Sequence, residues 1–151
     1  EKWSDVVRDA IKESDAKTIL DYGSGKGMQY DSLKLHERWG VERPTLYDPA
    51  VPGIDTPPSL FQKFDGVICL DVLEHLEGDE LRRAVFDATM RARKFALFGI
   101  ATFPAKKTLP DGRNAHLTLW GEDVWADFIN SHRFHSNALV MMHFDGGRRD
   151  P

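Results

Sequence analysis

The sequence predicts one α/β domain with a Rossmann-like, doubly wound and mostly parallel sheet, covered by helices on both faces and shortened after the second strand. Two observations lead to this fold class. Short apolar runs of strand length alternate with segments whose apolar residues recur at helical spacing. The connections are short, which favours parallel strands joined by helices. The length of 151 residues and the hydrophobic content of 41% fit a single folded domain over residues 1–151.

The first elements surround a glycine-rich turn. A helix is predicted over residues 4–14 with Ser4 as its N-cap, and an apolar strand follows over residues 18–22. After the turn, apolar spacing predicts a helix over residues 28–39, which Gly40 ends.

The middle of the chain is short of helix. A strand is predicted over residues 45–47, and residues 50–63 are so rich in proline and glycine that we expect a loop with at most a strand fragment around Ile54. Residues 67–70 form the most apolar run, which is typical of a strand covered on both faces.

The second half returns to regular alternation. We expect, in order, an amphipathic helix after Gly78, a strand over 95–100, a long polar loop over 101–119, a helix over 121–131, a strand over 138–142 and a frayed tail over 146–151. The expected inward face of the helix over 121–131 comprises Val124, Trp125, Phe128 and Ile129. Folds of this class usually add a seventh, antiparallel strand, and we expect that strand only in part, or in a continuation of the chain.

Composition excludes several classes of protein. The net charge of -4 and the pI near 5.8 disfavour a chain whose main task is to bind a phosphate backbone. The single cysteine, Cys69, lies in an apolar run, so neither a disulfide framework nor a Cys-rich metal site is predicted. No signal peptide or apolar run of membrane-spanning length is visible, and we expect a cytoplasmic protein without a membrane partner.

The residues suited to chemistry follow the ends of predicted strands. Asp21, Asp48 and Asp71 each come at such an end, as do the segment 72–76 and the loop 101–119. Ligands of parallel α/β sheets bind at the carboxyl ends of the strands, close to the switch in strand order. We therefore expect these separate segments to converge on one edge of the sheet.

The glycine turn is open to several interpretations. Gly23, Gly25 and Gly27 alternate with other residues, whereas a phosphate-binding P-loop requires a different spacing. A dinucleotide-binding fingerprint places its third glycine one residue later. Asp21 is also poorly placed beside a negatively charged pyrophosphate and is better suited to bind a cationic amine. An ordinary tight turn without a ligand remains the alternative.

Three segments resemble class I S-adenosylmethionine-dependent methyltransferases. Residues 19–27 (ILDYGSGKG) resemble the first motif of that family. Residues 64–76 (FDGVICLDVLEHL) resemble the fourth-strand segment of the subgroup that includes ubiquinone-biosynthesis-type enzymes. Residues 114–120 and the helix after them are similar to the His-containing entry to that subgroup's penultimate helix. The resemblance spans roughly residues 18–140.

The resemblance implies S-adenosylmethionine as cofactor and methyl transfer as activity. Asp21 and the backbone of residues 23–27 would hold the methionine portion, Asp48 would accept hydrogen bonds from the ribose, and Asp71 would lie beside the reactive end. The implied cofactor-binding residues are Asp21, Gly23, Ser24, Gly25, Gly27, Asp48, Pro49, Leu70 and Asp71. The sequence departs from the family after the second strand, where Asp55 is the expected contact of the adenine amine. Asp48 before Pro49 is also a residue that starts turns.

The chemistry requires mainly alignment of the two reactants. A general base is needed only if the acceptor arrives protonated, and His116 and His75 are the candidates, with Asp71 or Glu74 as orienting partner. Capping or pinning of the loop is the alternative role of these residues. Zinc ligation by His75 and His116 is the less favoured alternative, because neither HExxH nor Cys-rich spacing supports it, and no metal site is predicted.

The loop over residues 101–119 is the expected substrate-binding segment. Its candidate residues are Lys106, Lys107, Arg113 and Asn114. Their charge predicts a small acceptor that carries a carboxylate or a phosphate. Charge reversal at the two lysines is expected to raise the Michaelis constant.

Other functions remain open at this stage. One is a non-catalytic S-adenosylmethionine-binding module, which the short segment 50–63 favours. A methyltransferase that acts on RNA or protein is another, and its best nucleic-acid patch is Arg82, Arg83, Arg91, Arg93 and Lys94. A nicotinamide-dependent oxidoreductase is disfavoured by the glycine spacing. The sequence leaves the oligomeric state open.

Overall fold

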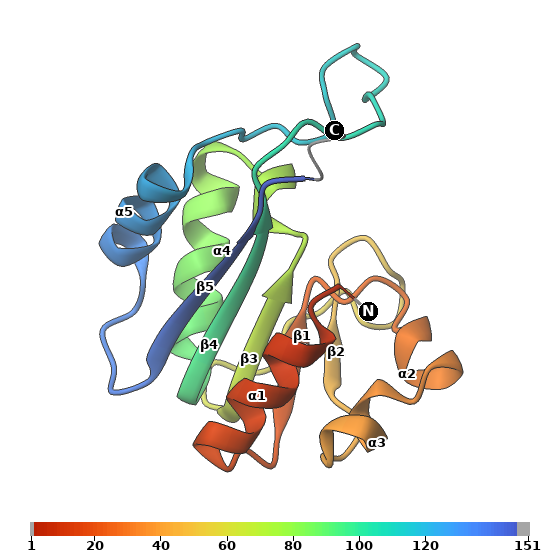
Figure 1. The fold of residues 1–151 in the computed structure, drawn as a ribbon, viewed down its shortest axis with the longest axis vertical. Helices are drawn as coiled ribbons and strands as arrows, with labels where there is room; N and C mark the ends of the chain where they lie inside the picture. The colour runs from red at the N-terminus through yellow and green to blue at the C-terminus, as the bar shows by residue number, and fades with distance from the viewer. Residues whose placement is uncertain (1, 148–151) are drawn as a thin grey trace.

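The structure, a computed structural model, describes residues 2–147 and contains a five-stranded, all-parallel sheet flanked by helices (Figure 1). The sheet has the strand order β2-β1-β3-β4-β5. The elements are α1 (Ser4–Ser14), β1 (Ile19–Tyr22), α2 (Met28–Ser32), α3 (Leu35–Trp39), β2 (Thr45–Tyr47), β3 (Phe64–Leu70), the 3₁₀ helix η1 (Leu73–His75), α4 (Gly78–Met90), β4 (Ala92–Ala101), α5 (Glu122–His132) and β5 (Leu139–Asp145). The predicted Rossmann-like α/β class is confirmed.

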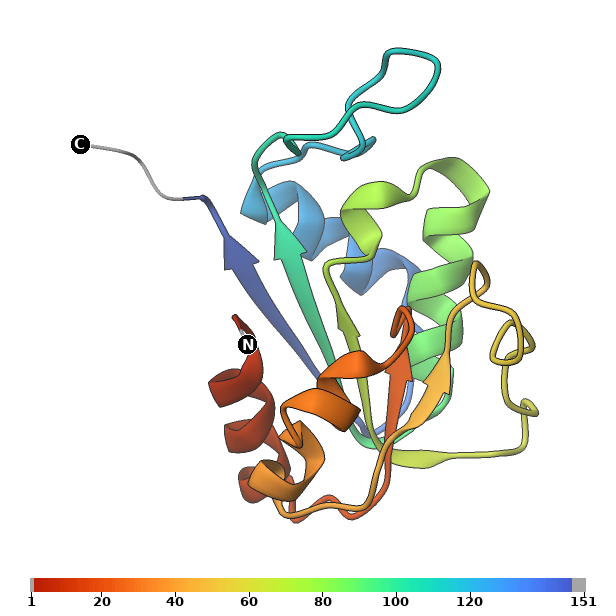
Figure 2. The same cartoon turned by 90° about the vertical axis from the view of Figure 1, so that its right-hand side faces the viewer.

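Helices cover both faces of the sheet, as predicted, and each face has its own core (Figure 2). On one face, Val7 and Ile11 of α1 pack with residues such as Phe95 of β4, together with α2 and α3. On the other face, Leu81 of α4 and Trp125 of α5 are fully buried against the sheet. Burial on both faces explains why β3 and β4 are almost continuously apolar.

The strand order contains one switch point, between β1 and β3. β2 lies on one side of β1, and the chain then crosses to the other side of β1 to form β3. β4 and β5 continue outward from β3 in the same direction. Segments that leave the carboxyl ends of β1 and β3 therefore diverge, which opens space for a ligand.

The predicted helix over residues 28–39 is wrong in one respect, because two short helices replace it. Lys34, between α2 and α3, has a φ of 52°. Tyr30, Leu35 and Trp39 are all buried in the same core. In one continuous helix, positions 30 and 35 would point about 140° apart, so the break lets both face inward.

Three smaller expectations also need correction. Ser4 does not cap α1: its Oγ accepts a hydrogen bond from Nε1 of Trp39 at 3.2 Å, and Trp3 is the N-cap residue. Val124 is 52% exposed, because α5 buries the narrower stripe around Trp125. No strand forms at Ile54, whose amide instead donates to the carbonyl of Val51 in a turn.

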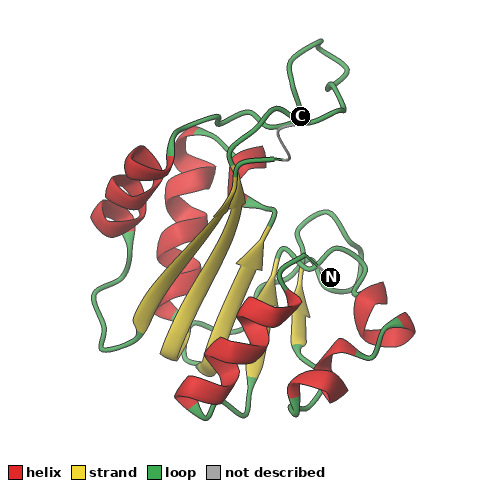
Figure 3. Cartoon of the chain, viewed as in Figure 1, coloured by secondary structure: helices red, strands yellow, loops and turns green. Residues whose placement is uncertain are grey.

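The carboxyl-terminal part of the sheet is longer than predicted. β5 continues to Asp145 and pairs in parallel register with β4, and residues 2–147 contain no antiparallel seventh strand. Of the tail predicted over 146–151, residues 148–151 lie outside the described part of the chain. The predicted loop between β4 and α5 extends beyond the carboxyl end of the sheet (green in Figure 3). A bridge between Thr108 and Asn114 is its one local pairing within the described residues.

Candidate functional site

The glycine turn after β1 is held by the end of β2. The amides of Gly23 and Ser24 both donate to the carbonyl of Tyr47, at 2.7 and 3.1 Å. The amide of Gly25 donates to Oδ2 of Asp48 at 2.8 Å. These three amides are therefore engaged by the protein and are not directed at a ligand, in contrast to the contacts that the family resemblance implies.

Two glycines of this turn are required by close packing. Gly23 has a φ of 81°, and a Cβ there would lie 2.4 Å from Cγ2 of Val72. Gly27 has a φ of 69°, and its Cβ would lie 2.4 Å from Cδ1 of Leu46. Gly25 shares the left-handed conformation with a φ of 58° but has open space around it. The turn is thus shaped by glycine through both conformation and contact.

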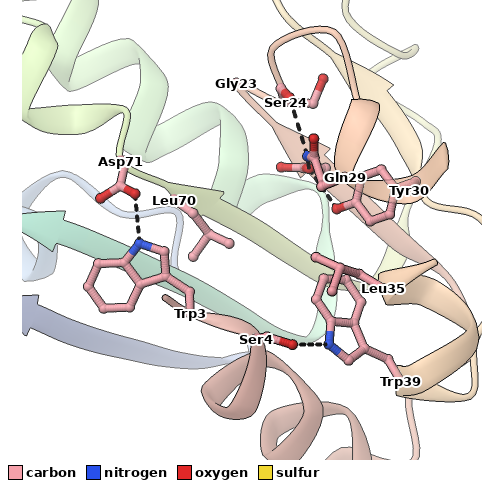
Figure 4. A pocket seen from close by; sticks show the side chains of 11 residues that line it. Trp3, Ser4, Gly23, Ser24, Gln29, Tyr30, Leu35, Trp39, Leu70 and Asp71 are labelled. Atoms are coloured by element: carbon pink, nitrogen blue, oxygen red, sulfur yellow. Dashed lines mark hydrogen bonds between the residues drawn. The ribbon is translucent and has the colours of Figure 1, made fainter. Parts of the chain in front are cut away.

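A cavity of about 290 Å³, here called the Asp21 cavity, opens beside this turn (Figure 4). The carboxyl ends of β1 and β3 form its wall on one side, and the amino-terminal end of α1 with α2 and α3 forms the other. Its lining residues are Trp3, Ser4, Asp21, Gly23, Ser24, Gln29, Tyr30, Leu35, Trp39, Leu70 and Asp71. Five of the predicted cofactor-binding residues are therefore brought together.

Asp21 is the buried acid of this cavity, with 4% of its surface exposed. Its Oδ2 accepts hydrogen bonds from the Tyr30 hydroxyl at 2.7 Å and from Nε2 of Gln29 at 3.3 Å. Burial raises the pKa of the Asp21 carboxyl to about 6, in spite of these two bonds, and the negative charge of Asp48 adds to the rise. A cation placed in the cavity would favour the ionised carboxylate.

Asp71 is held by the amino-terminal residues rather than by a histidine. Its Oδ2 accepts a hydrogen bond from Nε1 of Trp3 at 2.9 Å, and its Oδ1 pairs with Nζ of Lys2 at 2.8 Å. Asp71 has a φ of 54°, which is unusual for a residue other than glycine and is typical of functional turns. Lys2 also pairs with Asp145 at the end of β5, at 2.9 Å. The contacts of Lys2 and Trp3 with Asp71 could not be predicted from the sequence, because nothing local to these residues indicates so distant a partner.

A second cavity, of about 270 Å³, lies on the other side of Gly23 and is here called the Tyr47 cavity. Its walls come from the ends of β1 and β2, from Val72 and from the first turns of α4. The lining residues are Tyr22, Gly23, Tyr47, Pro49, Val72, Leu76, Glu80, Arg83 and Ala84. Gly23 lines both cavities, whereas Val72, which a Cβ at Gly23 would strike, lines the Tyr47 cavity alone.

Asp48 stands at the end of β2 but lines neither cavity. Its Oδ1 accepts the amide of Ala50 at 2.9 Å, which makes the Asx turn around Pro49 that the sequence left as an alternative. Its Oδ2 accepts the Gly25 amide. Asp55, the expected adenine contact, is exposed and also lines neither cavity.

Glu74, His75 and His116 form a separate cluster at the same edge of the sheet. Glu74 is fully buried, and its Oε1 accepts the amide of Ala101 at 3.0 Å. The two imidazole rings lie 4.8 Å apart between centroids. One ligand-type atom from each of the three residues lies within 4.8 Å of the others. Glu74, and not Asp71, is therefore the carboxylate beside these histidines.

The loop over residues 101–119 uses part of its predicted substrate-binding set for its own structure. Arg113 pairs with Glu77 at 2.9 Å and with Asp111 at 2.8 Å. The amide group of Asn114 exchanges hydrogen bonds with the backbone of Ala105 at 2.9 Å in both directions. Arg113 and Asn114 thus position the loop.

The two lysines of that loop differ in their placement. Lys106 lines a cavity of about 820 Å³ with Lys2, Phe103, Pro104, Asp145, Gly146 and Gly147, here called the Lys106 cavity. Lys107 is exposed and does not line it. Lys2 lines this cavity and pairs with Asp71, which lines the Asp21 cavity, so one ion pair joins the walls of the two cavities.

The basic residues around α4 are largely paired. The buried guanidinium of Arg91 pairs with Asp87, Arg82 pairs with Asp79, and the side chains of Arg93 and Lys94 each come within 3.9 Å of Asp65. Four of the five basic residues of the predicted nucleic-acid patch therefore lie beside a carboxylate.

Comparisons with protein-family models, with curated proteins and with solved structures found no match to this chain. None of the helices in residues 2–147 combines the length and the apolar character that a membrane crossing requires.

Proposed function

We propose that this chain binds S-adenosylmethionine and transfers its methyl group to a small acceptor. The observation that carries the proposal is a pair of cavities that share Gly23 as a lining residue, at the switch point of a parallel sheet. One holds a buried carboxylate, and the other has aromatic and apolar walls. Each alone is at or below the usual lower size of roughly 300 Å³ for a ligand pocket, whereas together they fit a ligand with two unlike halves.

The Asp21 cavity suits the amino-acid half of the ligand. An α-ammonium group there would pair with the carboxylate of Asp21 and offset the cost of burying its charge. Gln29 and Ser24 supply further polar contacts in the same cavity. The sulfonium would lie toward Asp71, whose side chain is fixed by Trp3.

The Tyr47 cavity suits the nucleoside half. The rings of Tyr22 and Tyr47 meet edge to face with centroids 4.9 Å apart, and with Val72 and Pro49 they offer flat and apolar surface to a base. Asp48 does not line this cavity but precedes Pro49, which does. Each of its carboxylate oxygens accepts one amide, and the remaining lone pairs would accept ribose hydroxyls that extend beyond the cavity wall.

The Lys106 cavity is the acceptor site of this proposal. Lys2 of this cavity pairs with Asp71, beside which the reactive end of the cofactor would lie, so an acceptor bound there would be near the methyl group. Bound S-adenosylmethionine would supply an activated methyl group, to which the nucleophile would bond as the carbon–sulfur bond breaks, with S-adenosylhomocysteine as the leaving group. Alignment supplies most of the acceleration. If the acceptor arrives protonated, Nε2 of His116 is a candidate to take its proton.

The charges favour a small anionic acceptor over RNA. Lys106 is exposed at its cavity, and within residues 2–147 it makes no ion pair. The basic residues around α4, in contrast, are mostly paired with acids. A long unstructured loop beside a ligand site is a usual place for substrate contacts.

Titration with half-ligands tests the two-cavity site. We expect adenosine and L-methionine each to compete weakly with S-adenosylhomocysteine in isothermal titration. Tyr47→Ala should weaken adenosine more than methionine, and Asp21→Asn should do the reverse. Glu13→Gln, on the exposed face of α1, is the control. Equal losses of both half-ligands in both variants would contradict the assignment of the two halves.

A further inference from the structure

The geometry points to a binding site for a divalent transition-metal cation such as Zn²⁺ at Glu74, His75 and His116. The sequence disfavours zinc ligation by His75 and His116, because neither HExxH nor Cys-rich spacing is present and 41 positions separate the two histidines along the chain. The fold brings the loop over residues 101–119 back onto η1 and so places the two rings together. This inference is independent of the proposed cofactor.

The carboxylate of Glu74 has an oxygen that is unpartnered within residues 2–147. Glu74 is fully buried, and Oε1 accepts the amide of Ala101, whereas Oε2 has no hydrogen-bond partner within the described residues. A buried oxygen without a donor costs on the order of 1–3 kcal/mol, and more when it is charged. A cation beside it would remove that cost.

Both imidazoles are oriented by a backbone carbonyl. Nδ1 of His75 lies 2.9 Å from the carbonyl of Ala115, and Nδ1 of His116 lies 2.5 Å from the carbonyl of Phe103. A carbonyl only accepts, so each Nδ1 carries the proton and each Nε2 carries a lone pair. Metal-binding histidines are usually held by a hydrogen bond of this kind from the other ring nitrogen.

Hydrogen bonds hold the loop over residues 101–119 against residues 74–76. The amide of Thr118 donates to the carbonyl of Glu74 at 3.1 Å, and its hydroxyl donates to the carbonyl of Leu76 at 2.6 Å. The amide of His116 is held by Oδ1 of Asn114 at 2.9 Å. The relative position of the two histidines is thus determined by several hydrogen bonds rather than by a free loop.

The ligand set defines the class of cation. Two imidazoles and one carboxylate suit zinc and its first-row neighbours, whereas Mg²⁺ and Ca²⁺ prefer oxygen ligands alone. The candidate atoms lie within 4.8 Å of one another, and a tetrahedral cation would draw them to roughly 3.3 Å. The exposed side chain of His75 has room to make that adjustment. Three ligands leave coordination positions open to water or to an acceptor.

A bound cation also changes the role of the histidines. The lone pair of Nε2 cannot both ligate a metal and take a proton from an acceptor. The metal site and a general base at His116 therefore exclude each other while the cation is bound. Without a cation, burial raises the pKa of the Glu74 carboxyl, and a protonated Glu74 is the competing explanation of its unpartnered oxygen.

Metal titration of the full chain tests the inference. After treatment with a chelator, Zn²⁺ is titrated in competition with a chromophoric chelator, and Co²⁺ is added separately to record its visible absorption. We expect one equivalent of Zn²⁺ to bind, the Co²⁺ spectrum of a four- or five-coordinate site, and much weaker binding of Mg²⁺. Glu74→Gln, His75→Gln and His116→Gln should each weaken Zn²⁺ binding at least about tenfold. His135→Gln, an exposed histidine outside the cluster, should leave it unchanged.

The wild-type chain supplies a second readout, in case a variant fails to fold. Zn²⁺ should shift the imidazole nitrogen resonances of His75 and His116 and leave those of His135 in place. Absence of stoichiometric binding, or binding that persists in all three cluster variants, would overturn the inference. S-adenosylhomocysteine is titrated into the same metal-free sample, so its result stands apart from that of the metal.

Discussion

The carboxylate of Asp48 at the end of β2 accepts the amide of Gly25 at 2.8 Å, so one acid links the strand to the glycine turn. Asp48 thus stabilises the glycine turn by a hydrogen bond within the protein. Its second oxygen holds the amide of Ala50, and the turn around Pro49 depends on that bond.

Asp48→Ala should therefore weaken S-adenosylhomocysteine at least about tenfold, through lost ribose contacts and a loosened turn. Asp48→Asn retains one acceptor oxygen and should lose less. Isothermal titration measures both, and Glu13→Gln serves as the control. Unchanged binding in Asp48→Ala would remove Asp48 from the site.

Asp21 should make ligand binding depend on pH. Its pKa of about 6 in the folded chain means that the carboxylate becomes ionised between pH 5 and 7. An ammonium group pairs with the ionised form, so affinity for S-adenosylhomocysteine should rise about tenfold over this range. Asp21→Asn should abolish the rise. A flat profile in the wild type would show that no cation is bound beside Asp21.

The same carboxylate affects stability with a definite sign. Its folded pKa lies above the ordinary value of 3.8, so the folded state holds more protons than the unfolded state between about pH 4 and 6. The contribution of Asp21 to the free energy of unfolding should therefore fall as pH rises through that window. Urea unfolding of wild type and Asp21→Asn at pH 4.5 and 7 measures this contribution. The free energy of unfolding of Asp21→Asn, relative to that of the wild type, should be higher at pH 7 than at pH 4.5. A lower relative value at pH 7 would contradict this sign.

Alanine substitutions at Gly25 and Gly23 distinguish the conformational from the steric contribution of these glycines to the free energy of unfolding. Gly25→Ala meets open space and should cost roughly 1 kcal/mol for its left-handed φ alone. Gly23→Ala also drives a methyl group into Val72 and should cost about 2 kcal/mol or more, with loss of ligand binding. Chemical denaturation reports both values. An equal cost for the two variants would mean that the Gly23 contact relaxes freely.

Trp3 offers a test of the amino-terminal contact with Asp71. Trp3→Phe removes the indole donor but keeps most of the packing, and should lower the free energy of unfolding by about 1 kcal/mol and weaken S-adenosylhomocysteine. Trp120→Phe, the same truncation at a half-buried tryptophan that does not line the Asp21 cavity, is the control variant. If the two variants bind the ligand equally well, Asp71 needs no support from Trp3.

The sequence predicted the parallel sheet, and the meeting of Asp21 and Asp71 at its carboxyl edge, because both depend on local patterns. Apolar runs located every strand, and the rule for carboxyl ends placed Asp21 and Asp71 on one cavity. What could not be predicted is how distant side chains pair. The bond from Trp3 to Asp71 spans 68 positions, and the proximity of His75 to His116 depends on the path of a loop without regular structure.

The break between α2 and α3 was missed for a related reason. The apolar residues over 28–39 fit a helix locally, but the core selects Tyr30, Leu35 and Trp39 together, which one helix cannot present. Tertiary packing outweighed local preference there, at the cost of a left-handed Lys34.

The most direct test of the account is isothermal titration of the chain with S-adenosylmethionine and S-adenosylhomocysteine, with NAD⁺ as the comparison ligand. We predict micromolar binding of both adenosyl ligands at one equivalent and none of NAD⁺. If neither adenosyl ligand binds, or if NAD⁺ binds as tightly as they do, the two cavities at Gly23 are not a methyl-donor site and the proposed function is wrong.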